Sequence, residues 1–218
     1  MLELFDQAHG LGACAAAAPT RLMPVPAMGA ASHRLLWLLA RRLARQGETV
    51  VVLDGLADEA GPGVGDADGA RAGLAGALAG EGGGRIGLAL PQADEVWPGV
   101  HIVPARQGLL RLANQASQAG AAPVPERLRR LLPQGCCLLL TASADVLAVC
   151  LQGTAARPLV ALEAAPGAAA GSANGQPRAL VEAYNAVKVL LQAGELRPVL
   201  LPMAPAAARG GLDALDTP

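Results

Sequence analysis

The side chains that most often carry catalysis or hold metal ions are scarce in this sequence. Its 17 basic residues are 16 arginines and a single lysine, Lys188, so chemistry that needs a lysine at a fixed place must use that one. The histidines and cysteines lie in unrelated stretches, at His9, His33, His101, Cys14, Cys136, Cys137 and Cys150. No cysteine pair has the C-x-x-C spacing of a zinc site, and no spacing brings a nucleophile, a histidine and an acid together. We therefore predict no metal site and no catalytic residues.

Charge and composition limit the possible partners. The 218 residues carry a formal net charge of -1, which leaves no cationic excess for the phosphates of a nucleic acid. The hydrophobic fraction is 52%, much of it alanine, and no apolar run reaches the roughly 20 residues that span a bilayer. The first residues lack the basic region of a secretory signal. We predict a cytoplasmic protein with no nucleic-acid partner and no stable membrane association.

Short apolar runs alternate with helical stretches along the chain. The runs are almost wholly apolar, which is typical of strands covered by helices on both faces of a parallel sheet. The predicted strands are residues 21–28, 49–55, 85–90, 99–105, 136–142, 157–164 and 197–204. The sequence therefore predicts a doubly wound α/β fold with a mostly parallel sheet, in which Cys136 and Cys137 are small core residues.

Two helices have clear patterns. Between the first two strands, leucines recur at helical spacing at Leu35, Leu36, Leu39 and Leu43. Ser32 can cap this helix and Gly47 can end it. The second helix spans residues 177–194, with Pro177 near its start and Gly194 as its stop. We expect its apolar stripe at Leu180, Tyr184, Val187 and Leu191.

The chain has one domain with extensions. Residues 1–20 form an N-terminal segment, residues 21–205 form the α/β domain, and residues 206–218 form a flexible tail. Inside the domain, residues 59–73 and 164–177 are rich in glycine, proline and small side chains, so we predict mobile loops there.

The turn from the first strand into the first helix is where an α/β sheet binds phosphate. Here it reads PVPAMGAASHR, residues 24–34, whereas a Walker loop needs G-x-x-x-x-G-K-[ST]. Lys188 lies far downstream inside the second helix, so an orthodox phosphate loop is excluded. At the end of the second strand, Asp54 is either a remnant base or magnesium contact or a cap for the next turn, and we favour the cap.

Four stretches nevertheless resemble the MinD/ParA-type ATPases, and most of all their flagellar-number regulators, the FlhG (FleN) group. Residues 5–11, FDQAHGL, resemble the D-Q-A-x-x-L-R motif of that group. Residues 38–55 resemble the first helix and second strand of the superfamily, residues 99–114 a strand and its following segment, and residues 177–194 the helix after the sixth strand. Together they cover roughly Phe5 to Met203, and they imply a SIMIBI/MinD-like P-loop NTPase fold.

Carried over position by position, the resemblance implies a degenerate nucleotide site. Ser32 stands where the family has its phosphate-binding lysine, His33 where it has a magnesium-coordinating Ser/Thr, and Ala27 where it has a signature lysine. Gly29 keeps a loop glycine, and Asp54 keeps the first acid after the second strand. We therefore predict a remnant site at Gly29, Ser32, His33 and Asp54.

Two of the family's acids are also replaced. Leu56 occupies the place of the second acid after the second strand, and Thr141 that of the aspartate ending the fifth. Without the cations, phosphoryl transfer loses its positioning and its charge stabilisation. The resemblance thus implies the fold and predicts against the activity, with no ATP or magnesium expected.

The resemblance also implies a partner, because the family's N-terminal motif engages the SRP-type GTPase FlhF. The matching residues here are Asp6, Gln7, Ala8 and Leu11, while Gly12 replaces the motif's arginine. That replacement affects stimulation of the GTPase more than docking. The membrane-binding helix that ends the family's proteins has no counterpart, so we expect neither ATP-driven dimerisation nor membrane cycling.

A second candidate partner-binding residue lies on the first helix. Trp37 is placed beside a stripe of arginines, Arg34, Arg41 and Arg45. An aromatic residue among arginines is a common interaction anchor, but it also packs readily under their aliphatic stems. Both interpretations remain open.

These patterns predict a pseudo-ATPase that regulates flagellar number or placement by binding an FlhF-like GTPase or another flagellar assembly protein. One alternative is a divergent MinD/ParA-type ATPase that uses Asp54 and the backbone amides around Gly29. Another is a related scaffold in cell division, chromosome partition or cellulose secretion. The sequence is compatible with a monomer or an oligomer.

Overall fold

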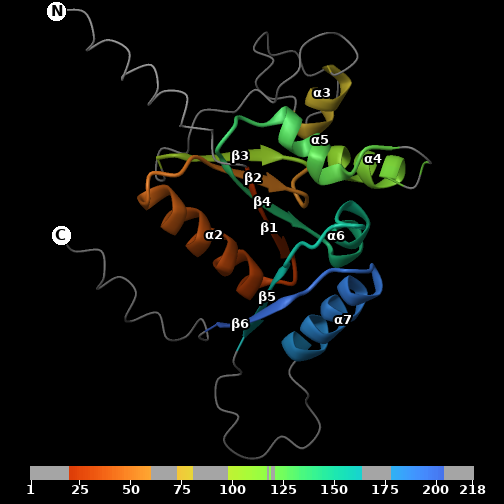
Figure 1. The fold of residues 1–218 in the computed structure, drawn as a ribbon. Helices are drawn as coiled ribbons and strands as arrows, with labels where there is room; N and C mark the ends of the chain where they lie inside the picture. The colour runs from red at the N-terminus through yellow and green to blue at the C-terminus, as the bar shows by residue number, and fades with distance from the viewer. Residues whose placement is uncertain are drawn as a thin grey trace, which may run out of the picture.

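The computed structural model describes residues 20–59, 73–80, 98–116, 118, 121–163 and 178–203. Along the chain its elements are β1 (Arg21–Pro26), α2 (Ala30–Arg45), β2 (Val50–Asp54), α3 (Gly73–Gly80), β3 (Val100–Pro104), α4 (Arg106–Ala116), α5 (Val124–Leu131), β4 (Cys137–Ala142), α6 (Ala144–Cys150), β5 (Leu159–Glu163), α7 (Arg178–Gln192) and β6 (Val199–Met203). Figure 1 shows their arrangement.

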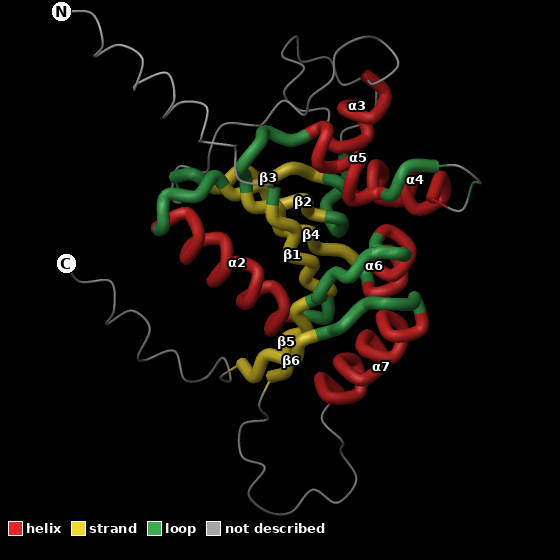
Figure 2. Tube along the Cα trace, in the orientation of Figure 1, coloured by secondary structure: helices red, strands yellow, loops and turns green. Residues whose placement is uncertain are grey.

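All the described strands pair in parallel, in the hydrogen-bonded order β1-β4-β2-β3 and, separately, β5-β6. The two-stranded sheet extends the larger one, because β5 lies next to β1 (Figure 2). The doubly wound, parallel α/β fold is therefore confirmed, and six of the seven predicted strands are present. The seventh, residues 85–90, lies outside the described residues.

Prolines explain why the sheet is divided between β1 and β5. The backbone N–H groups of Arg21 and Ala27 donate to carbonyls on the β4 side. Since N–H groups alternate between the two sides of a strand, those of even-numbered positions point toward β5. Pro24 and Pro26 occupy two of these positions and have no N–H to donate. β1 therefore pairs fully with β4 and offers β5 almost no donors.

Helices cover both faces of the sheet, as Figure 1 shows. α2 lies on one face, where its Leu35 and Leu36 are buried with Val50 and Val52 of β2. The helices α4, α5, α6 and α7 pack on the other face around a larger core that includes Leu53 of β2. Because parallel strands are buried on both faces, their side chains are apolar without alternation.

The predicted cap of α2 is wrong. The helix begins at Ala30 after Gly29, and no side chain caps it. Ser32 lies inside the first turn and is only 2% exposed, one turn before Leu36 on the buried face. The predicted end is correct, because Gly47 follows the helix with a φ of 83°, which glycine adopts without steric cost.

The predicted apolar stripe of α7 is also not its buried face. Of its four members, Leu180, Tyr184 and Leu191 are 45%, 65% and 54% exposed. The fourth, Val187, is half-buried and packs against the core. The helix instead packs through small residues and one leucine, at Ala183, Ala186 and Leu190. These alanines let α7 approach the sheet closely, and a pattern built on large side chains overlooks them. Gly194 ends the helix with a φ of 118°, as predicted.

The cysteines of the domain are core residues, as predicted for two of them. Cys136, Cys137 and Cys150 are free and buried. Burial raises the pKa of the Cys150 thiol to about 12, and it also raises the pKa values of Cys136 and Cys137. A thiol with a raised pKa carries little thiolate at neutral pH, so none of the three is an activated nucleophile.

Several predictions concern parts of the chain outside the described residues. These are the N-terminal segment 1–20 apart from Thr20, most of the loop 59–73, the loop 164–177 and the tail 206–218.

Candidate functional site

The turn between β1 and α2 consists of Ala27, Met28 and Gly29. Gly29 has a φ of 97° and a ψ of -159°, a conformation that is essentially restricted to glycine. Its carbonyl accepts the N–H of His33 at 3.2 Å, the first bond of α2. Gly29 is thus needed here for the backbone conformation that starts the helix.

A pocket of about 340 Å³ opens between this turn, α2 and the ends of β2 and β4, and we call it the Trp37 pocket. Its lining is Ala27, Gly29, Ala30, His33, Leu36, Trp37, Val52, Asp54, Leu56, Ile102 and Thr141. Three of the four predicted remnant-site residues, Gly29, His33 and Asp54, therefore meet in one pocket. Ser32 is not among the lining residues, because it lies on the face of α2 that packs on the sheet.

Trp37 and His33 form a pair one turn apart on α2. The indole Nε1–H of Trp37 donates to Nε2 of His33 at 2.8 Å, and the rings meet edge to face with centroids 5.9 Å apart. Trp37 is half-buried and lines the pocket. Of the two interpretations of this residue, packing against neighbouring residues is seen directly. Its role as an anchor for a partner stays a prediction.

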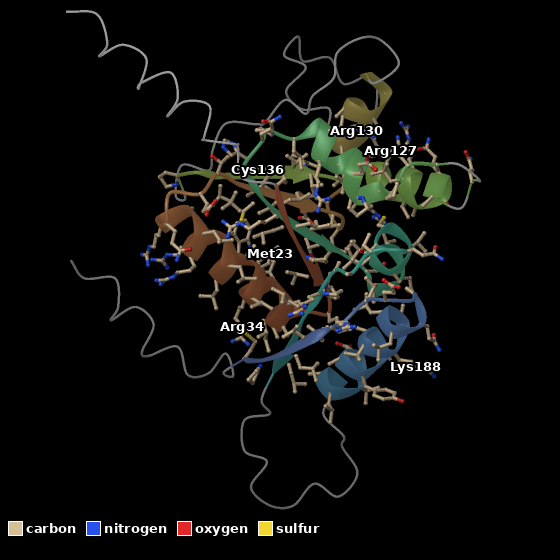
Figure 3. The ribbon with its side chains drawn as sticks, in the orientation of Figure 1. Met23, Arg34, Arg127, Arg130, Cys136 and Lys188 are labelled. Carbon is tan, nitrogen blue, oxygen red and sulfur yellow. The ribbon has the colours of Figure 1, made fainter. Side chains whose placement is uncertain are left out.

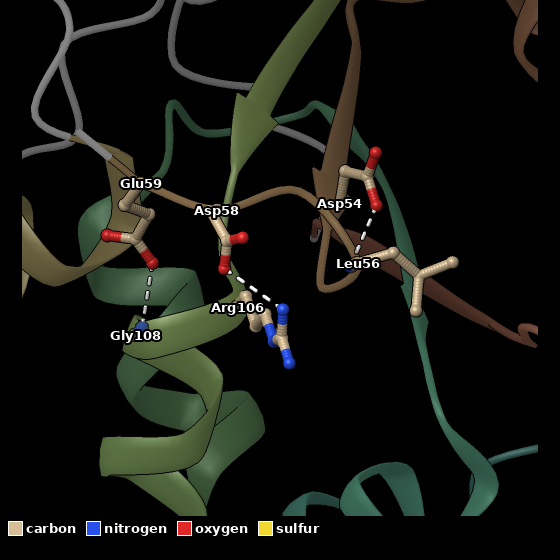
Figure 4. Close-up of polar contacts among 6 residues, drawn as sticks. All are labelled: Asp54, Leu56, Asp58, Glu59, Arg106 and Gly108. Carbon is tan, nitrogen blue, oxygen red and sulfur yellow. Dashed lines mark hydrogen bonds and ion pairs between the residues drawn. The ribbon is translucent and has the colours of Figure 1, made fainter.

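Asp54 caps the turn that follows β2. Its Oδ1 accepts the N–H of Leu56 at 2.9 Å, which is the arrangement we favoured from the sequence (Figure 4). Leu56, at the place of the family's second acid, is exposed at the rim of the pocket. Gly55 lies between them and donates its N–H to the carbonyl of Thr141 at 2.7 Å, which ties the turn to β4.

A second pocket of about 620 Å³ lies on the other side of the Ala27–Gly29 turn, and we call it the α7 pocket. It is lined by Ala27, Met28, Gly29, Ala144, Asp145, Glu182, Asn185, Ala186 and Val189. Within the described ranges, the two linings together contain three acidic side chains, Asp54, Asp145 and Glu182, and no lysine or arginine. Lys188 lies on the exposed side of α7 (Figure 3).

These residues do not fit a triphosphate. A phosphate loop places a lysine and several backbone N–H groups around the anion. Here the side chain at the lysine's place, Ser32, is buried away from the turn, and its hydroxyl has no hydrogen-bond partner within the described residues. Two like charges about 4 Å apart near a protein surface repel by about 4 kcal/mol. The acidic linings would thus oppose the negative charge that a phosphate loop must stabilise.

Sequence reasoning missed Glu59, which is 7% exposed and anchors two helices beside the site. Its Oε1 accepts the N–H of Gly108 in α4 at 2.7 Å (Figure 4). Its Oε2 accepts the N–H of Ala75 in α3 at 2.5 Å. A carboxylate at two helix N-termini is stabilised by both dipoles. The sequence gives no signal for this contact, because both donors are backbone groups of remote segments.

The described residues show neither a metal site nor a membrane span. Within the described ranges, no three His, Cys, Asp or Glu residues lie together as a metal site requires. None of the helices in that part of the chain is long and apolar enough to cross a bilayer.

Comparison with known proteins finds similarity in structure alone. The sequence matches no protein-family profile and no curated protein. The fold is shared. Among solved structures, the BceF tyrosine kinase domain matches with a TM-score of 0.45 and 16% identity, over 85% of this chain and 69% of that one. The kinase domain of the Escherichia coli tyrosine kinase ETK matches with a TM-score of 0.49 and 15% identity, over 92% and 74%. The chimerical protein CapA2B2 matches with a TM-score of 0.48 and 12% identity, over 90% and 82%.

At these identities the likeness concerns only the arrangement of helices and strands. The function has to be inferred from the residues of the site itself.

Proposed function

We propose that this chain is a MinD/ParA-like scaffold that binds a protein partner and neither binds nor hydrolyses ATP. The proposal rests on one observation: among the described residues, the two pockets beside the Ala27–Gly29 turn are lined by three carboxylates and by no lysine or arginine. Phosphoryl transfer depends on cations that stabilise the charge of the transferred group. A rigid α/β body with acidic pockets beside this turn is suited to display binding surfaces instead.

The proposal also concerns the cellular process in which the scaffold acts. Flagellar control, with an FlhF-like GTPase or another flagellar assembly protein as partner, depends on Asp6, Gln7, Ala8 and Leu11, which lie outside the described residues. Flagellar control thus rests on that motif alone. We therefore rank a related scaffold role, in cell division, chromosome partition or cellulose secretion, ahead of it.

The divergent ATPase remains the competing enzyme. It would use Asp54 and the backbone amides near Gly29, but the Oδ1 of Asp54 already caps a turn and the pocket wall beside it is mostly apolar.

The partner proposal predicts binding that is independent of nucleotide. The full-length chain and the FlhF-type GTPase of the same organism are mixed and analysed by size-exclusion chromatography with light scattering, with and without ATP and magnesium. A flagellar role predicts a complex in both conditions that is lost when Asp6, Gln7 and Leu11 are all replaced by alanine. A complex that survives this triple replacement contradicts the docking hypothesis.

The same experiment distinguishes the flagellar assignment from the scaffold proposal. If the wild-type chain forms no complex with the GTPase, the flagellar assignment is wrong, while the scaffold proposal stands or falls with the nucleotide titration described in the Discussion. A complex that forms only with ATP contradicts the scaffold proposal itself.

A further inference from the structure

The Trp37 pocket has the size and lining of a site for a small ligand or a single long side chain. Its volume of about 340 Å³ lies at the lower end of the range of ligand pockets. Most of the wall is apolar and comes from α2, β2 and β3, with Leu36, Trp37, Val52 and Ile102 as its larger members. An occupant would therefore bury a hydrocarbon or aromatic body against it.

Two of the residues that line this pocket, Asp54 and His33, carry hydrogen-bond acceptors. Asp54 is half-buried, and only its Oδ1 accepts a hydrogen bond within the described part of the chain, from Leu56. Figure 4 shows the second oxygen pointing away from that bond. Nε2 of His33 accepts the indole N–H of Trp37, so this acceptor is already used by a neighbouring side chain.

The local charge favours a cation over an anion. The N-terminus of α2 contributes a positive partial charge of about half a unit near Gly29 and Ala30, whereas the Asp54 carboxylate carries a full negative charge. No lysine or arginine of the described part of the chain lines the pocket. The carboxylate therefore outweighs the helix terminus, and Trp37 supplies an aromatic ring that also attracts cations.

We propose that the Trp37 pocket binds an organic cation, an amidinium, guanidinium or ammonium group carried on an apolar body, with Asp54 accepting its hydrogen bonds. The geometry is that of a charge-assisted hydrogen bond at the end of an apolar slot. The cation is either a free amine or the basic side chain of a protein partner, and these two sources share the same chemistry. The inference rests on the proposed function, because an ATP-binding turn would place phosphate here.

The test follows the indole N–H signal of Trp37 by NMR in the full-length chain. The other tryptophan, Trp97, is replaced by phenylalanine so that one indole signal remains. Benzamidine is the probe, and benzamide is the neutral control of the same shape. We expect benzamidine to shift the Trp37 signal in a saturable way and benzamide to leave it unchanged.

Two matched variants place the cation at Asp54. In Asp54→Asn the amide oxygen can still cap the turn, so the fold is preserved, and we expect benzamidine binding to weaken at least about tenfold. Asp58→Asn removes the same charge from an exposed residue that is paired with Arg106 at 3.1 Å, outside the pocket, and should leave binding unchanged. Equal binding of benzamidine and benzamide, equal loss in both variants, or no shift at all would overturn the inference.

Further probes separate the two sources and the two proposals. Tighter binding of acetyl-glycyl-arginyl-glycinamide than of agmatine indicates a partner's side chain, and the reverse order indicates a free amine. A shift with ATP and magnesium would contradict the proposed function. If neither ATP with magnesium nor benzamidine shifts the Trp37 signal, this inference is wrong and the proposed function is unaffected.

Discussion

Replacing Glu59 with alanine is expected to lower the free energy of unfolding by about 3 to 5 kcal/mol. The buried carboxylate accepts the N–H groups of Ala75 and Gly108, which belong to the first turns of α3 and α4. Without it, two buried backbone donors lose their acceptor, and each unmet donor costs about 1 to 3 kcal/mol. Urea denaturation followed by circular dichroism measures the change.

The matched variants of Glu59 separate its contacts from its charge. Glu59→Gln keeps one side-chain oxygen as an acceptor, so the loss should be roughly half that of the alanine variant. Asp58→Ala removes the neighbouring acid, which is exposed and forms an ion pair with Arg106, and should change stability by less than about 1 kcal/mol. Equal small losses in Glu59→Ala and Asp58→Ala would show that the carboxylate does not anchor the helices.

Replacing Gly55 with alanine is expected to lower the free energy of unfolding by about 3 kcal/mol. A Cβ at this position would lie 2.6 Å from the carbonyl oxygen of Thr141 and 2.8 Å from the Leu109 Cδ1 and the Ala142 Cβ. The nearest of these is backbone in β4, which cannot move without breaking the pairing of β2 with β4. Thermal and urea unfolding measure the loss.

The neighbouring residue supplies the control for Gly55. Leu56→Ala removes an exposed side chain from the same turn and should change stability by no more than about 0.5 kcal/mol. If Gly55→Ala is as mild as Leu56→Ala, the turn and β4 do not pack as closely as the structure indicates.

The strands were predictable because parallel strands covered on both faces have continuous apolar sequences. Val50 to Leu53 and Leu138 to Leu140 are buried almost completely, and no other local structure of that length suits such runs as well. The helix faces were less predictable. On α7 a pattern of large apolar residues points outward, while the alanines that pack on the sheet look unremarkable in an alanine-rich sequence.

The site was predictable where a single element determines it. Gly29, His33 and Asp54 follow from the order of the first strand, helix and second strand, and the structure brings them into one pocket. The acids of the α7 pocket come from α6 and α7, which are distant in sequence. Glu59 was assigned to a loose loop because its two partners are backbone groups, and backbone groups leave no trace in a sequence.

The contact between Trp37 and His33 was only partly predictable from the sequence. Their spacing of four residues puts them on one face of α2, so the contact was available from the sequence. The arginine stripe beside Trp37 instead favoured the interpretation of this residue as a surface anchor for a partner. Arg34 and Arg41 are half-buried, and Trp37 turns toward the pocket rather than away from the domain.

Isothermal titration calorimetry of the full-length chain with ATP and magnesium tests the central claim, that a turn flanked by acidic pockets stands in place of the phosphate loop. The acidic linings, which contain no lysine or arginine among the described residues, predict no binding heat at millimolar ATP and no nucleotide-dependent shift in melting temperature. A saturable binding curve with a dissociation constant in the micromolar range would contradict the claim and restore the ATPase.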